Sequence, residues 1–277
     1  MLELFDSYAL LLLVPLLCVP VQLLFLKSGQ RYDLGAVTYI AGGTFIAVAV
    51  SAPINRTIAV SVLTLLFAAI LGAFTLRVFA LAFGRPADFT LISFGQLWAT
   101  PALIDYELQI LTKSSGLPME PLRIHPSVVA LAVSAVVAVL GYVIAKSSLP
   151  HRLTAITESP VEYRLLCGSP VSLALKLETL AFLTYVSAGI LLGLLLNNVS
   201  KDNFGDESIW CVLAAAPAAR SSGALIFAGP FLAILARILI KSIVPVRFAT
   251  LAVYAALAIL LAILISCTPE ASRDATA

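Results

Sequence analysis

The chain has 277 residues, of which 61% are hydrophobic and only 12% are charged, and its mean hydropathy is +1.04. Because soluble domains carry about 25% charged residues, this composition excludes an ordinary soluble domain and predicts an all-α polytopic membrane protein embedded in the lipid bilayer. The formal net charge is only +2, which lacks the strong positive excess of nucleic-acid-binding proteins and predicts no nucleic-acid partner.

Apolar runs in chain order predict the membrane segments, because about 20 apolar residues cross a bilayer as a helix. The expected segments are residues 8–26, 34–52, 58–83, 91–103, 128–145, 171–196, 209–219, 224–240 and 248–267. About eight or nine membrane segments result, some of them short or broken. Pro101 is expected to end the fourth segment, so that 105–126 forms a polar connection. The polar tail 268–277 is predicted to be disordered.

Basic residues in short loops predict which loops face the cytoplasm. With the polar stretch 149–170 placed inside, alternation along the chain also places inside the loop 27–31 and the turn at Arg85. The turn at 53–56 and the loops 105–126 and 197–207 then lie outside together.

The sequence carries no catalytic or metal-binding motif. None of the four cysteines is paired at metal-ligand spacing, and the absence of a phosphate-binding loop means that any ATP is hydrolysed by another chain. The charged residues within apolar segments are Arg77, Lys176, Glu178 and Arg237. Lys176 and Glu178 lie near the inner end of their helix, from which they could snorkel, and the favoured interpretation of all four is interfacial or helix-pairing charge.

The stretch 149–170 connects two apolar segments and contains signals for a short helix from Ser159 to Leu166. Ser159 suits the N-cap and Pro160 the first turn. Two interpretations stay open, a solvated connector and a cytoplasmic coupling loop that docks a soluble subunit. Tyr163 and Leu165 are the expected anchors of the docked subunit. Replacing both by Asp is expected to uncouple ATP hydrolysis from transport while leaving the protein in the membrane. The residues assigned to coupling are Arg152, Glu158, Ser159, Glu162, Tyr163, Arg164, Leu165 and Leu166.

Small and polar residues gather in two of the apolar segments and predict a translocation path. The residues assigned to it are Gly42, Gly43, Thr44, Ser93, Gly95 and Gln96. Glycines in a membrane helix permit either close helix packing or an unwound stretch beside a cavity, and both alternatives are open for 42–44. If Gly43 lines the path, Gly43→Leu blocks transport without loss of expression.

Four stretches together resemble one family. They are residues 33–45 (DLGAVTYIAGGTF), 83–95 (FGRPADFTLISFG), 152–168 (RLTAITESPVEYRLLCG) and 214–224 (AAAPAARSSGA). In order and spacing over nearly the whole chain, they are similar to the second helix, the Arg-Pro turn, the cytoplasmic loop and the re-entrant segment of bacterial ABC importer permeases of the branched-chain amino acid family, which includes urea and amide permeases and is related to sugar permeases.

The resemblance implies a type II-like ABC importer permease, with 1–277 as a single transmembrane permease domain in the bacterial inner membrane. It implies a transporter subunit and not an enzyme, moving a small polar or amphipathic solute, with branched-chain or hydrophobic amino acids expected. ATP and Mg²⁺ would bind to ATPase subunits, and this chain would hold no cofactor. The other implied partners are a periplasmic solute-binding protein and a second permease chain. The family has several glycines where this chain has Ala215, Ala216, Pro217 and Ala218, and this departure favours a heterodimer over a homodimer.

Three alternatives remain beside this interpretation. The first is an ABC permease for urea, a sugar or a nucleoside. The second is a secondary transporter driven by an ion gradient, which needs acidic residues at membrane depth that the sequence does not clearly show. The third is a membrane scaffold without transport. Co-purification of a nucleotide-binding subunit separates the ABC importer from the other two classes.

Overall fold

The computed structural model describes residues 2–28, 31–83, 85–114, 116–119, parts of 128–144, 147–159, 163–165, 168–200, 203–204, 207–220 and 228–243. Side chains are described over most of these ranges from residue 12 onwards. Contacts divide the chain into two compact units, residues 1–234 and 235–277. The helix bundle and its buried side chains belong to the first unit.

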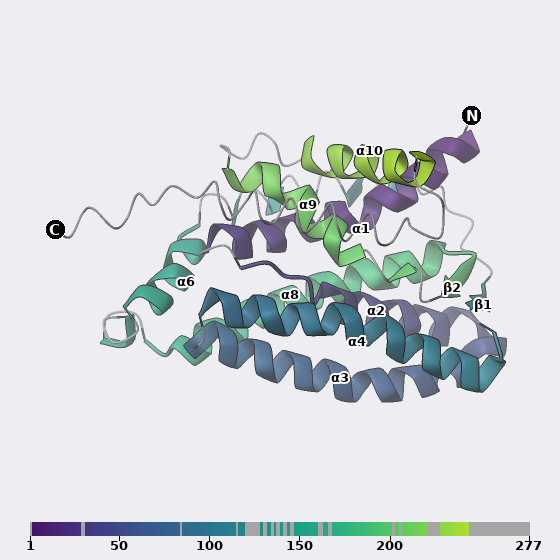
Figure 1. Cartoon of the computed structure of the whole chain (residues 1–277), viewed down its shortest axis with the longest axis horizontal. Helices are drawn as coiled ribbons and strands as arrows, with labels where there is room; N and C mark the ends of the chain where they lie inside the picture. Colours follow the sequence, from purple (N-terminus) through teal and green to yellow (C-terminus); the bar gives the residue numbers. More distant parts are fainter. Residues whose placement is uncertain are drawn as a thin grey trace. The chain divides into compact units, whose positions relative to one another are not determined.

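The described part of the chain is mostly helical (Figure 1). Its elements are α1 (Leu2–Lys27), α2 (Ala36–Ser51), the 3₁₀ helix η1 (Pro53–Asn55), α3 (Arg56–Phe83), α4 (Pro86–Thr112), β1 (Gly116–Pro118), α6 (Leu149–Glu158), α8 (Pro170–Leu195), β2 (Asn198–Ser200), α9 (Glu207–Arg220) and α10 (Ala228–Ile243). The segments predicted at 34–52, 58–83 and 171–196 are confirmed as helices α2, α3 and α8. The segment predicted at 248–267 and the tail 268–277 lie outside the described residues.

Among the described residues, two helical stretches are long and apolar enough to cross a membrane, Pro53–Phe83 and Pro170–Leu195, and two shorter helices, Leu12–Lys27 and Ala36–Ser51, are also apolar. Large apolar side chains cover the outward faces of α3 and α4, including Phe67, Leu71, Phe79, Leu91 and Trp98, each more than half exposed. In water such a surface is unfavourable, whereas lipid tails solvate it well. The outward faces therefore have the chemistry of lipid-facing helices.

Helices α2 and α8 make the most extensive contact in the bundle, and glycines bring them together. A Cβ atom on Gly43 would collide with the Val186 carbonyl oxygen, and one on Gly189 with the carbonyl oxygen of Ile40. Small residues allow this approach of two backbones. Because α2 is continuous from Ala36 to Ser51, close packing and not an unwound stretch explains its glycines.

Helix α4 corrects the prediction that Pro101 ends a short segment. The helix runs without interruption from Pro86 to Thr112, so the expected polar connection from 105 is helical to Thr112. Proline removes one backbone hydrogen bond, a cost of about 3 kcal/mol in a helix. Packing against α3 and α2 offsets it, and the hydroxyl of Thr100, next to the proline, is 2.8 Å from that of Thr38.

The expected loop at 149–158 is also corrected, because it forms helix α6. Pro150 stands in its first turn. Leu149, Leu153 and Ile156 have the spacing of one helix face, and the last two are buried, at 0% and 3% exposure. This helical spacing of apolar residues is present in the sequence, but the intervening residues are polar and no helix was predicted from it.

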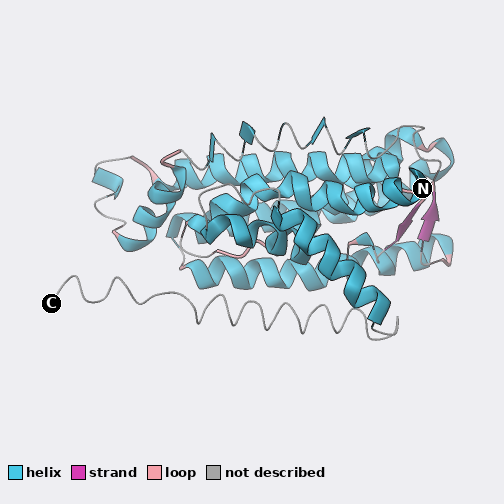
Figure 2. Ribbon diagram, turned by 90° about the horizontal axis from the view of Figure 1, so that it is seen from above, coloured by secondary structure: helices cyan, strands magenta, loops and turns pink. Residues whose placement is uncertain are grey.

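Two short strands join loops that are far apart in the sequence. β1 and β2 pair antiparallel, with Leu117 opposite Val199, and Figure 2 shows the pair at one end of the helices. The Asn55 amide donates to the Pro118 carbonyl oxygen at 2.7 Å. The three loops that alternation places on one membrane face therefore lie together, although no strand was predicted.

Candidate functional site

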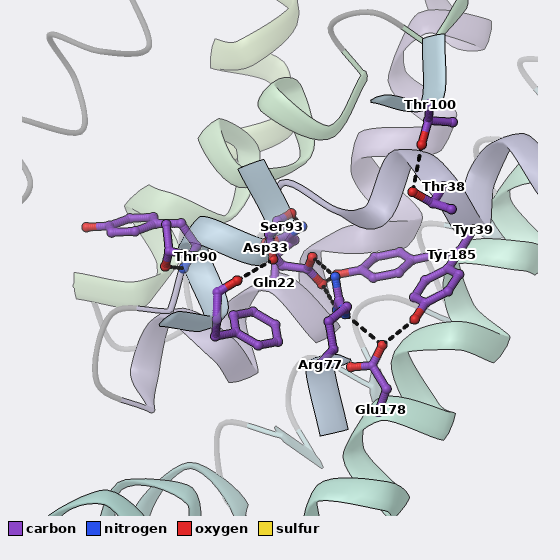
Figure 3. Close-up of polar contacts among 12 residues, drawn as sticks. Gln22, Asp33, Thr38, Tyr39, Arg77, Thr90, Ser93, Thr100, Glu178 and Tyr185 are labelled. Atoms are coloured by element: carbon purple, nitrogen blue, oxygen red, sulfur yellow. Dashed lines mark hydrogen bonds and ion pairs between the residues drawn. The ribbon is translucent and has the colours of Figure 1, made fainter. Parts of the chain in front are cut away.

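The segment between α1 and α2, residues 31–35, is not helical and yet is buried. Buried backbone outside a helix must find its hydrogen bonds within the protein. The Gln22 amide donates to the Asp33 carbonyl oxygen at 2.8 Å, and the Tyr32 N–H donates to the Thr90 hydroxyl at 3.2 Å (Figure 3). Side chains of α1 and α4 thereby hold Asp33 in place inside the bundle.

Three charged side chains from three parts of the chain meet there (Figure 3). Arg77, on α3, donates from Nη1 and Nη2 to the two carboxylate oxygens of Asp33 at 2.5 and 2.7 Å. Its Nε donates to Oε1 of Glu178, on α8, at 2.7 Å. All three side chains have 0% exposure. Asp33, Arg77 and Glu178 are called the charge cluster below.

Two buried tyrosines complete the hydrogen bonds of the charge cluster. The Tyr39 hydroxyl donates to Glu178 Oε1 at 2.6 Å, and the Tyr185 hydroxyl donates to Asp33 Oδ2 at 2.8 Å. Hydrogen bonds to ionised groups are roughly twice as strong as neutral ones. The tyrosines therefore tie α2 and α8 to the same charges that join α3 to α8.

Three aromatic rings surround the Arg77 guanidinium. Its central carbon lies 4.8 Å from the ring centroid of Phe89, 5.3 Å from that of Tyr39 and 6.0 Å from that of Phe25. The faces of aromatic rings attract cations, by about 2 kcal/mol or more when water is excluded. The rings stabilise the cation and keep the charge cluster dry.

The charge cluster is not balanced. One guanidinium faces two carboxylates, so the formal charge is −1 if all three groups are ionised. Both donors to Glu178 reach Oε1, whereas Oε2 is buried and has no hydrogen-bond partner among the described residues. An uncompensated charge inside a bundle is costly. Glu178 Oε2 is thus the position at which the cluster lacks a partner.

Glu178 does not snorkel, because its carboxyl is buried in the bundle, where it pairs α8 with α3 as the helix-pairing interpretation predicts. Lys176, two residues away on α8, is exposed. The interpretation of Arg77 as a helix-pairing charge is confirmed, since it joins α3 to α8. Asp33 was missed as a site residue because it stands at the edge of a polar loop, where a charge needs no explanation.

The structure does not bring the six predicted path residues together. Thr44 donates to the Gly189 carbonyl oxygen at 3.0 Å, and a Cβ on Gly42 would meet Ile70 of α3. Ser93 is buried and donates to the Phe89 carbonyl oxygen at 2.8 Å. Gly95 is exposed, with open space where a Cβ would lie.

Gln96 is a predicted path residue that lies beside the charge cluster. A Cβ placed on Gly35 would collide with the Gln96 side-chain oxygen and would lie 2.7 Å from Arg77 Nη1. The side chains of Gln96 and Arg77 therefore both lie against the backbone of Gly35 in the buried segment. Both side-chain polar atoms of Gln96 lack a hydrogen-bond partner in the described part of the chain.

The predicted coupling residues divide into a buried and an exposed set. Tyr163 is only 5% exposed and its N–H donates to the Ser159 carbonyl oxygen at 2.9 Å, one helical turn back. Leu165 is 81% exposed, and Arg152, Glu158 and Arg164 are also exposed. Tyr163 is therefore an internal anchor and not a docking residue. Glu162 and Leu166 lie outside the described residues.

The tyrosine hydrogen bonds predict a measurable loss of stability. Tyr185→Phe keeps the ring and removes the hydroxyl that donates to Asp33, so we expect a loss of about 1.5–3 kcal/mol, the usual value for a hydrogen bond to a charged group. Thermal unfolding of the purified protein measures it. Tyr106→Phe is the control, because Tyr106 is 63% exposed and should not change the unfolding temperature. Equal unfolding temperatures for both variants would contradict a role for the Tyr185 hydroxyl.

No family model, curated protein or solved structure matches the chain. The resemblance of the four sequence stretches stays a prediction, and the function is argued from the helices and side chains of this chain.

Proposed function

We propose that the chain is the membrane-spanning permease subunit of an importer in a bacterial inner membrane, powered by ATP hydrolysis on a separate subunit. The proposed solute is small and polar or amphipathic, and branched-chain or other hydrophobic amino acids are the first solutes to test. The observation that carries the proposal concerns residues 149–159 and 163–165 of the connection between the bundle helices: some of their side chains are buried in the bundle and others are exposed.

A coupling element must transmit force, and this connection has the attachments for it. Leu153, Ile156 and Tyr163 are buried, at 5% exposure or less, and α6 contacts α1, α3 and α8. A displacement of α6 by a bound subunit would therefore be transmitted to three helices of the bundle, whereas a solvated connector without buried contacts would not transmit it.

The outer side of the same connection offers a small docking patch. Leu165 is 81% exposed, and the neighbouring Arg164 is exposed as well. A buried aliphatic anchor supplies most of the affinity in such contacts, and charges set orientation and association rate. This chemistry suits a groove on a soluble subunit that has an apolar floor and an acidic rim.

Leu165→Asp tests the proposal. Removing an interface anchor and burying a charge in its place costs about 2 kcal/mol or more, so we expect at least a roughly 30-fold loss of affinity for the ATPase subunit. The measurement is recovery of an ATP-binding subunit with the tagged chain from its native membranes, together with solute-stimulated ATP hydrolysis.

Ile54→Asp is the matched control, because Ile54 is 94% exposed and its neighbour Asn55 bonds to β1, at the end of the bundle opposite α6 (Figure 1). It should leave ATPase binding unchanged. A Leu165→Asp protein that still binds the ATPase and transports normally would refute the coupling role. The double change of Tyr163 and Leu165 is unsuitable, since an aspartate at the buried Tyr163 disturbs folding itself.

A second candidate is a secondary transporter driven by an ion gradient, and the charge cluster favours it. Buried charges at membrane depth mark ion and proton pathways in many transporters. Transport by the purified chain in vesicles, without any ATPase and abolished by a protonophore, would establish this candidate in place of the first.

A further inference from the structure

Within the charge cluster, the single guanidinium of Arg77 faces the two carboxylates of Asp33 and Glu178. The positive charge of Arg77 is already balanced by Asp33, which accepts two hydrogen bonds from it. Glu178 adds a second carboxylate, one oxygen of which has no hydrogen-bond partner among the described residues. We propose that Glu178 binds a proton at Oε2, which makes the charge cluster a proton-binding site inside the helix bundle. The inference is independent of the proposed function.

A proton fits this site better than a metal ion. Hard cations take about six or more oxygen ligands, and the described residues offer one free carboxylate oxygen at this point. In the described part of the chain no group of three or more His, Cys, Asp or Glu side chains gathers around a common centre. A proton needs only the single oxygen, and a neutral carboxyl without a partner costs far less than a buried charge without one.

The charged and titratable groups around Glu178 come from each helix that packs against α8. Arg77 lies on α3 and Tyr39 on α2, Asp33 lies in the buried segment before α2, and Tyr185 stands on α8 itself. The buried thiol of Cys18, on α1, faces Tyr185. The charged residues of α6 are exposed on its outer side.

A further cation stands in the buried segment itself. Arg31 donates from Nη1 to the Ser28 carbonyl oxygen. Burial lowers the pKa of Arg31 to about 10, so that it keeps its charge at neutral pH. Arg77 is the cation that bonds both carboxylates.

Two side-chain amides beside the buried segment also have polar atoms without a hydrogen-bond partner among the described residues. Gln22 Oε1 and both polar atoms of Gln96 are buried and have no partner among the described residues. Gln22 bonds the Asp33 carbonyl oxygen, and Gln96 lies against Gly35 beside Arg77. These amides provide donors and acceptors next to the cluster for a water molecule that delivers or accepts the proton.

The proton links pH to the packing of the helices. Binding transfers one proton from hydronium to Oε2 and leaves water, without any change in oxidation state. Its release leaves two carboxylates facing one guanidinium at the junction of α2, α3 and α8, which favours hydration and separation of these helices. Because the folded state holds a proton that an exposed glutamate would have lost at neutral pH, stability must fall as pH rises.

Infrared spectroscopy of the full chain in detergent or nanodiscs tests the proposal directly. At neutral pH the wild-type protein should show the carbonyl band of a protonated carboxyl, shifted in heavy water. Labelling glutamate with ¹³C should move this band, and labelling aspartate should not. The band should be lost in Glu178→Gln and kept in the control Glu158→Gln, since Glu158 is exposed.

Asp33→Asn supplies a test in which Glu178 is still present. With one carboxylate left for Arg77, Glu178 should ionise and the band should disappear. The wild-type unfolding temperature should fall between about pH 5 and about pH 8, and that of Glu178→Gln should stay level. A wild-type protein without the band would overturn the proposal, and if added Na⁺ then raised its unfolding temperature, a metal cation would occupy the site instead. A band kept in Asp33→Asn would overturn the charge-balance argument.

Discussion

Arg77→Met is expected to unfold much of the protein, because it leaves the buried Asp33 carboxylate without its cation and the Glu178 carboxyl without one of its two donors. Removing one partner of a buried ion pair costs about 3–5 kcal/mol, and a domain has only about 5–15 kcal/mol of stability in total. Arg77 is bonded to both Asp33 and Glu178, so the upper part of this range applies. Thermal unfolding and the monodisperse fraction after detergent extraction measure the effect.

Two further variants separate charge from packing at Arg77. Arg56→Met is the control, since Arg56 is exposed at the start of the same helix, and it should unfold like the wild type. Neutralising the carboxylates as well, in Asp33→Asn/Arg77→Met/Glu178→Gln, should restore much of the stability, because a neutral cluster has no unpaired charge. An Arg77→Met protein as stable as wild type would show that the charge cluster does not hold the bundle together.

Gly43→Leu is expected to destroy the contact between α2 and α8. The new side chain would begin with a Cβ that collides with the Val186 carbonyl oxygen, and a backbone atom cannot move aside as a flexible side chain does. Overpacking costs about 1–3 kcal/mol even where side chains can adjust, so we expect more than about 3 kcal/mol here. The measurement is the amount of folded protein recovered from membranes.

Gly72→Leu is the matched control for Gly43→Leu. Gly72 lies on the exposed face of α3 with open space for a Cβ, and leucine there should gain up to about 1 kcal/mol from its better helix propensity. The sequence-based expectation, a transport block with normal expression in Gly43→Leu, holds only if Gly43 lines a path. Normal yield and unfolding temperature in that variant would support the path and contradict the packing role.

The sequence by itself determined the features that depend on neighbouring residues. Apolar runs of membrane length fixed α2, α3 and α8. The turn at 53–56 was predicted from Pro53 and Asn55, which form η1. Each of these signals acts over a few residues, which is why it can be recognised without knowing the fold. The fourth segment was predicted to begin at residue 91, whereas α4 begins at Pro86, where the Asp88 carboxylate accepts from the Arg85 N–H at 2.7 Å.

The tertiary structure alone decided what Asp33, Arg77 and Glu178 do. They are separated by 44 and 101 residues along the chain, so no local pattern relates them, and each has an ordinary explanation as a loop or interface charge. Whether a charge snorkels or pairs depends on which neighbour its helix face meets. The same holds for Pro101, whose lost hydrogen bond ends a helix only where packing does not offset it.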